Sequence, residues 1–125
     1  MLSNSSKYAL RALKCLAEQA PDKYLRVEQL SELADVPGPY LSKLIKTLSE
    51  KGLVETRRGL TGGVRFPQKR SISFYDICAA LEDPVTAQGC FISNGACSKN
   101  HPCEFHQRWS KVREQYMALL RKTLI

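Results

Sequence analysis

Two short apolar-patterned segments on either side of a tight turn limit the possible folds of this chain more than any other feature. Apolar side chains recur at helical spacing in residues 27–35 and again in residues 39–51, after the turn Val36-Pro37-Gly38. A proline in the first helical turn has no N–H bond to lose, so Pro39 predicts the start of the second helix. Gly52 predicts a left-handed cap at its end. Two short helices joined by a tight turn form a helix-turn-helix, a pattern that many helical hairpins share.

The residues after Gly52 predict a basic β-hairpin. Residues 53–57 are typical of a strand, residues 58–63 of a glycine-rich turn, and residues 64–66 of a return strand that ends before a proline. The side chains suited to contact with phosphates or a minor groove are Arg57, Arg58 and Arg65, and glycines such as Gly62 and Gly63 let the backbone approach the same groups. A helix-turn-helix followed by such a hairpin is a winged helix, so we expect a mainly α fold with a small β wing. A plain surface hairpin with solvated charges is the alternative.

Two further helices are expected to complete the winged helix. Residues 5–20 have the apolar periodicity of an amphipathic helix, and Leu33 joins the inward side of the helix over residues 27–35. The segment Ser73-Phe74-Tyr75-Asp76 resembles a capping box, which predicts a helix over residues 76–82. Cys78 lies among the apolar positions of that helix, so we expect it to pack in the core.

The charge balance of the chain favours an anionic partner. Its 125 residues suit one domain, and 19 Lys and Arg against 12 Asp and Glu leave a net charge of +7. An excess of this size most often marks nucleic-acid binding, with simple solubility as the alternative. No apolar run approaches the roughly 20 residues that span a bilayer, and the N-terminus begins no signal peptide. We therefore expect a cytoplasmic protein without membrane contact. There is no nucleotide loop, Ser/His/Asp set or C-x-x-C pair, so we do not expect an enzyme.

Residues 104–124 predict one long helix with an apolar seam. Aromatic and aliphatic side chains recur there at alternating spacings of four and three residues, at Phe105, Trp109, Val112, Tyr116 and Leu119. Such a seam can pack on the N-terminal helix of its own chain or on a second copy. We expect a homodimer in which these side chains form the interface.

A cluster of soft metal ligands lies before this helix and in its first turn. Cys90, Cys97, Cys103 and His106 follow the spacing C-x6-C-x5-C-x2-H, and thiolates and imidazoles bind zinc and iron–sulfur clusters. Cys103 precedes a helix N-terminus, which favours its thiolate, and His106 lies one turn further on the same face. The pattern fits a tetrahedral zinc site or an iron–sulfur cluster without separating the two. It is also near the spacing of CCCH zinc fingers, which bind RNA.

Together these motifs resemble the Rrf-two (Rrf2) family of bacterial winged-helix repressors. The resemblance rests on the segments Ser6–Leu13 and Tyr40–Leu44, on the wing Arg58–Gly63 and on the cysteine trio, and it is closest to the iron–sulfur, IscR-type branch. It implies a homodimer with crossing C-terminal helices, a second helix of the helix-turn-helix in the major groove and a wing in the minor groove.

The resemblance also implies roles for individual residues. Those facing bases or phosphates would be Pro39, Tyr40, Ser42, Lys43 and Lys46. Arg57 or Arg58 would serve the wing with Gly62 and Gly63. The three cysteines match the cluster ligands of the family, and His106 matches the histidine ligand of the IscR type.

The leading hypothesis is a dimeric, DNA-binding transcription regulator, acting as a repressor on double-stranded operator DNA. It would sense iron–sulfur, redox or nitric-oxide status through a Cys-ligated cluster of two or four irons. Residues 1–84 would form the winged helix, residues 85–103 the cluster-binding loop and residues 104–125 the dimerisation helix. The alternatives are a winged-helix regulator with a structural zinc and a CCCH-like zinc module that binds RNA.

Overall fold

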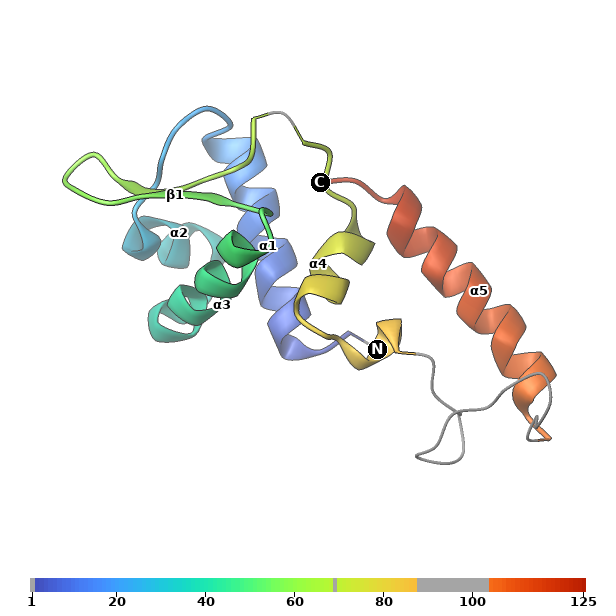
Figure 1. Cartoon of the computed structure of the whole chain (residues 1–125). Coiled ribbons are helices and arrows are strands. Elements are labelled where there is room, and N and C mark those ends of the chain that lie inside the picture. Colours follow the sequence, from blue (N-terminus) through green and yellow to red (C-terminus); the bar gives the residue numbers. More distant parts are fainter. Residues whose placement is uncertain (1, 69, 88–103) are drawn as a thin grey trace.

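The computed structural model of the chain describes residues 2–68, 70–87 and 104–125. Within these ranges the chain is mainly helical with one small sheet (Figure 1), which confirms the expected fold class. The predicted ligands Cys90, Cys97 and Cys103 lie outside the described residues. The elements in order are α1 (Asn4–Gln19), α2 (Val27–Ala34), α3 (Gly38–Glu50), β1 (Glu55–Arg57), β2 (Gly63–Arg65), α4 (Phe74–Ala80), the 3-10 turn η1 (Pro84–Thr86) and α5 (His106–Lys122).

Helices α1, α2 and α3 form the helix-turn-helix around a leucine-rich core. α1 packs against both α2 and α3. The fully buried side chains at the centre are Leu13, Leu16, Leu30, Leu41 and Leu48. Each buried leucine contributes about 2 kcal/mol relative to an exposed one. Because α3 buries one apolar edge in this core, its opposite face points to solvent.

Leu33 departs from the expected pattern, since its side chain is 56% exposed. α2 has only 8 residues, and the buried positions in it are Leu30 and Ala34. These two lie nearly in line one turn apart, so a helix this short buries one narrow stripe and leaves Leu33 beside it. The prediction that Leu33 faces inward was wrong.

The wing is a short antiparallel hairpin that a third segment holds in place. β1 and β2 pair with Thr56 opposite Val64, and each has 3 residues. β1 is shorter than the predicted strand over residues 53–57, and β2 begins one residue before the predicted return strand. The Leu25 N–H donates to the Val64 carbonyl at 2.9 Å, and the Val64 N–H donates to the Leu25 carbonyl at 2.7 Å. Val64 is fully buried at this junction. The loop between α1 and α2 therefore anchors the wing to the helical core.

Gly62 and Gly63 are required by the backbone of the wing itself. A Cβ atom on Gly62 would lie 2.1 Å from the carbonyl oxygen of Arg57, and one on Gly63 would lie 2.1 Å from the carbonyl oxygen of Leu25. Gly63 also has a φ of 140°, a backbone conformation that residues other than glycine rarely adopt. Close packing inside the protein is thus sufficient to explain both glycines.

Helix α4 begins with the capping box that the sequence predicts. The Ser73 hydroxyl accepts from the Asp76 N–H at 3.1 Å, and the Asp76 carboxylate accepts from the Ser73 N–H at 2.9 Å. Because Ser73 is the capping residue itself, the helix begins at Phe74 rather than at residue 76. Cys78 is fully buried, as expected.

A buried carboxylate closes the corner after α4. Asp83 is 2% exposed; one of its oxygens accepts from the Ser3 N–H at 2.9 Å and from the Ser6 hydroxyl at 2.6 Å, and the other accepts from the Val85 N–H at 2.9 Å. Burial alone would raise the pKa of Asp83, but these hydrogen bonds outweigh it and hold that pKa below its ordinary value. The carboxylate fastens the first turn of α1 to the segment that leaves α4.

Helix α5 packs against α4 at the end of the molecule away from the wing (Figure 1). Met117 and Leu120 are buried in a small cluster with Cys78. The last residues return to the start of α4, where the Phe74 N–H donates to the Thr123 carbonyl at 2.9 Å. None of the helices in the described ranges is both long and apolar enough to cross a bilayer.

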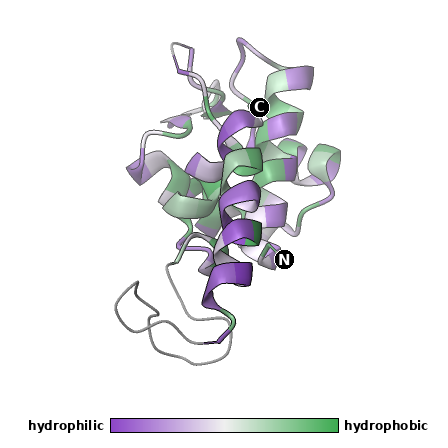
Figure 2. Ribbon diagram, turned by 90° about the vertical axis from the view of Figure 1, so that its right-hand side faces the viewer, coloured by the Kyte–Doolittle hydropathy of each residue, from purple (hydrophilic) through white to green (hydrophobic). Residues whose placement is uncertain are grey.

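The face of α5 that packs on α4 includes Tyr116 of the predicted apolar seam, but its buried residues Met117 and Leu120 lie outside that seam. Phe105, Val112 and Leu119 are 39%, 54% and 62% exposed, and Trp109 and Tyr116 are half-buried. In the view onto α5, hydrophobic segments are interspersed with hydrophilic ones along the helix (Figure 2). The helix therefore has two apolar faces, of which one packs on α4.

Candidate nucleic-acid interface

The outward face of α3 brings together the residues expected to read DNA. Pro39, Tyr40, Ser42, Lys43 and Lys46 are all exposed. The opposite side of the same helix is buried through Leu41, Leu44, Ile45 and Leu48. The helix thus presents a continuous polar and basic surface whose orientation is set by the core behind it.

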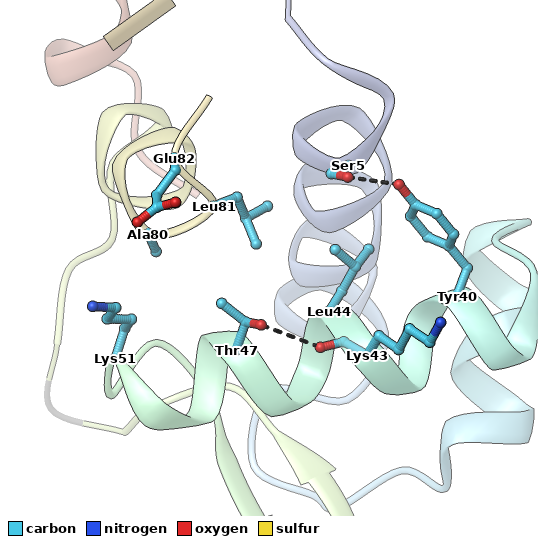
Figure 3. Close-up of a pocket in the computed structure, with 9 residues that line it drawn as sticks. All are labelled: Ser5, Tyr40, Lys43, Leu44, Thr47, Lys51, Ala80, Leu81 and Glu82. Atoms are coloured by element: carbon cyan, nitrogen blue, oxygen red, sulfur yellow. Dashed lines mark hydrogen bonds between the residues drawn. The ribbon is translucent and has the colours of Figure 1, made fainter. Parts of the chain in front are cut away.

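Tyr40 is held in place by the first turns of α1. The hydroxyls of Tyr40 and Ser5 are 2.6 Å apart and share a hydrogen bond (Figure 3). The ring of Tyr8 contacts the Tyr40 ring edge-on, with the ring centroids 5.2 Å apart. The sequence had not indicated any role for Ser5 here, because the contact depends on the packing of α1 across α3.

The same part of α1 carries two sets of contacts. Ser3 and Ser6 donate to the carboxylate of Asp83, while Ser5, in the same turn, holds Tyr40. One helical turn therefore connects the segment that leads toward residue 88 with a predicted DNA-contacting side chain on α3.

A cavity of about 470 Å³ lies between α3, the start of α1 and the end of α4 (Figure 3). Lys43, Thr47 and Lys51, on successive turns of α3, line one side of it, and Glu82 lies on the other. Thr47 and Lys51 extend the polar and basic surface beyond the residues that the sequence singled out.

The wing arginines differ in what they contact. Arg57 stacks over the Tyr24 ring at 4.2 Å and donates to the Thr61 carbonyl at 2.7 Å. Arg65 stacks over the same ring at 4.6 Å and donates two hydrogen bonds to the carboxylate of Glu55. Those bonds are the main reason why the pKa of Glu55 is lowered. Tyr24 thus braces two arginines against the hairpin.

Arg58 is the wing arginine that no contact within the described residues holds in place. Over the part of the chain that the structure describes, its side chain has no hydrogen bond, ion pair or ring contact, and the residue is exposed. The charge of Arg65, by contrast, is compensated by Glu55. Within the described ranges the wing therefore has one guanidinium without contacts, one that is oriented but not neutralised, and one that is paired with a carboxylate.

His106 is the one predicted metal ligand among the described residues. It is the first residue of α5 and half-buried, and its Nε2 lies 3.5 Å from the Ser110 hydroxyl. Over residues 2–68, 70–87 and 104–125, no three His, Cys, Asp or Glu side chains are grouped closely enough to hold a metal ion. The predicted cysteine ligands belong to the segment outside these ranges.

Known proteins share both the sequence and the fold. The family model Rrf2, an iron-dependent transcriptional regulator, matches residues 2–125. The HTH-type transcriptional regulator NsrR of Bacillus subtilis is 29% identical over 123 residues, which are 97% of this chain and 84% of NsrR.

Two solved structures are similar in fold. CymR, the global cysteine regulator of B. subtilis, matches with a TM-score of 0.78 and 22% identity, covering 99% of this chain and 92% of CymR. IscR of T. potens matches with a TM-score of 0.75 and 23% identity, covering 99% of this chain and 82% of IscR.

These matches agree with the helix-turn-helix, the wing and the exposed basic face of α3. The family and the relatives are transcriptional regulators and not enzymes, as expected from the sequence. The family match extends over both the winged helix and α5. The chain belongs to the Rrf2 family of transcriptional regulators.

Proposed function

We propose that this chain is a homodimeric repressor that binds operator DNA through α3 and the wing and responds to an iron–sulfur cluster. The observation that carries the DNA-binding part is the junction between the two elements. Ser42 of α3 and Gly62 of the wing line one shallow cavity, so a helix suited to a major groove lies beside a hairpin suited to a minor groove. The net charge of +7 supports an anionic partner.

Removal of the free wing charge tests this part of the proposal. Arg58→Gln should weaken binding to duplex DNA and lower the slope of log K against log salt by about 0.9, the value for one lost phosphate contact. Lys14→Gln is the matched control, since Lys14 lies on the outer side of α1 with Glu18 as its ion-pair partner at 3.9 Å. Fluorescence anisotropy with labelled duplex measures both. Equal affinity and slope for Arg58→Gln and wild type would remove the wing from the interface, and a preference for single-stranded RNA would favour the CCCH-like alternative.

The homodimer is supported by exposed apolar side chains of α5. Phe105, Val112 and Leu119 are exposed although large and apolar, and they recur at heptad-like spacing. A second copy of α5 would bury these side chains, which the α4 contact within the chain leaves outside. A dimer would also pair two α3 helices, as a two-fold symmetric operator requires.

The cluster is supported by the chemistry of the donor set. Three thiols at Cys90, Cys97 and Cys103, with the His106 imidazole at the start of α5, suit an iron–sulfur cluster, and the NsrR and IscR relatives belong to the same family. When bound, such a cluster supplies sensitivity to oxidants and nitric oxide. The protein's own contribution would be to connect the ligand segment to α5 and, through Asp83, to the start of α1.

Anaerobic purification followed by a visible spectrum and assays of iron, acid-labile sulfide and zinc tests the cofactor. Charge-transfer bands with iron and sulfide, both lost in Cys97→Ala, are expected. A colourless protein with one zinc would contradict the cluster and favour the structural-zinc alternative.

A further inference from the structure

A cavity of about 260 Å³ separates the wing from the start of α2 and from α3. Its charged and polar side chains are Arg26, Arg57, Glu28 and Ser42, and glycines of the wing complete the wall. Arg26 belongs to none of the patterns that the sequence analysis used.

Both arginines of this cavity are oriented by carbonyl groups of the wing tip. Arg26 donates to the Leu60 carbonyl at 3.1 Å, and Arg57 donates to the Thr61 carbonyl at 2.7 Å. A guanidinium has five N–H donors, so each retains donors for an anion. Neither forms an ion pair with a carboxylate anywhere in the described ranges. The wing tip therefore orients two guanidinium groups that line the same cavity, and neither is paired with a carboxylate in these ranges.

We infer that this cavity binds one phosphodiester of the DNA backbone; the inference rests on the proposed function. A helix in the major groove and a wing in the adjacent minor groove are separated by one sugar–phosphate strand. The cavity lies between the two elements, where that strand has to pass. Planar guanidinium groups match phosphate oxygens with paired hydrogen bonds.

Glu28 makes the assignment testable in both directions. Its carboxylate lines the same cavity and repels an anion there. Removal of this negative charge should strengthen DNA binding, whereas removal of Arg26 should weaken it. Damage to the fold lowers affinity in every variant. Changes in DNA affinity of opposite sign at Arg26 and Glu28 would therefore indicate an effect of charge in the cavity.

The experiment uses the full chain and a labelled mixed-sequence duplex in a salt series. Arg26→Gln should weaken binding roughly tenfold at low salt and lower the slope of log K against log salt by about 0.9. Arg26→Lys should keep the slope but lose part of the affinity, since lysine retains the positive charge without the planar set of N–H donors. Glu28→Gln should bind a few-fold more tightly. Lys14→Gln controls for net charge, and thermal melting verifies that each variant is folded.

The possible failures are distinct. If the wild-type protein does not bind duplex at all, the proposed function fails first. If it binds but Arg26→Gln keeps the wild-type slope, or Glu28→Gln does not tighten binding, the cavity does not hold a backbone phosphate. Inorganic phosphate compared with chloride at equal ionic strength separates the two sources of this anion. If phosphate raises the melting temperature of the wild type and Arg26→Gln abolishes this effect, the occupant is a free phosphate, and the proposal that the cavity binds a DNA phosphodiester is wrong.

Discussion

Asp83 allows a stability prediction whose size can be worked out from its contacts. Its two oxygens accept three hydrogen bonds, from the Ser3 N–H, the Ser6 hydroxyl and the Val85 N–H. Asp83→Asn keeps one oxygen. In the better orientation that oxygen retains the Ser3 and Ser6 bonds, and the new NH₂ group faces the Val85 N–H, so two donors oppose each other.

The expected loss follows from these contacts. A hydrogen bond to a charged group contributes about 1.5–3 kcal/mol, and an unsatisfied buried donor adds a similar penalty. The two retained bonds also weaken, because their acceptor is now neutral. We expect Asp83→Asn to lower the free energy of unfolding by about 3 kcal/mol, a large share of the stability of an ordinary domain.

The assay is urea unfolding followed by far-ultraviolet circular dichroism at neutral pH and one protein concentration, because a dimer would make stability depend on concentration. Asp35→Asn is the matched control, since the Asp35 side chain is fully exposed and its φ of 55° suits asparagine. The control should change stability by less than about 0.5 kcal/mol.

The pH dependence gives a second check on the same residue. Because the folded pKa of Asp83 is lowered, its contribution is complete above the unfolded pKa of about 3.9 and is lost as the pH falls through the folded value. The difference in free energy of unfolding between wild type and Asp83→Asn should therefore be constant from neutral pH to about pH 5 and should decrease below pH 4. If the two Asp→Asn variants unfold at the same urea concentration, the three hydrogen bonds do not stabilise the corner and the reasoning is refuted.

Two further predictions concern α5 and the wing. Leu119→Glu should convert the proposed dimer to a folded monomer, measured by light scattering after gel filtration, because it places a charge in the exposed apolar face of α5. Lys111→Glu, at an exposed position of the same helix, should leave the mass unchanged. A Leu119→Glu variant that is still dimeric would exclude this face as the interface. Gly63→Ala should lower the free energy of unfolding in urea by more than about 3 kcal/mol, because the new Cβ meets the Leu25 carbonyl. Gly59→Ala, with a φ of 102° but open space around it, should lower it by only about 1 kcal/mol. Equal losses would mean that a small backbone shift relieves the clash at Gly63.

Local patterns were sufficient to predict the helices and the hairpin. Pro39, Gly52 and the Ser73 capping box act within one turn of their own positions, so the ends of α3 and the start of α4 could be placed within two residues. The prediction for Leu33 was wrong because periodicity indicates only that a side chain belongs to an apolar stripe. The width of the stripe that is buried depends on helix length and on the neighbouring helix.

The details of the interface could not be read from the sequence, since they arise from contacts between distant segments. Tyr24 stacks with Arg57 and Arg65 only after the hairpin returns to the loop before α2. The sequence could identify three wing arginines but not that two of them are engaged within the protein. In the same way, the two apolar faces of α5 became distinguishable only once Met117 and Leu120 were seen against α4.

The glycine pair of the wing has a consequence for how such chains are recognised. Gly62 and Gly63 are demanded by the carbonyls of Arg57 and Leu25, whatever the hairpin touches outside the protein. A descendant that had stopped contacting DNA would still need both glycines to fold, while Arg58, which has no contact among the described residues, could be replaced. The double glycine therefore identifies the architecture of the wing, and the residue at position 58 is the better indicator of whether a given member still uses it.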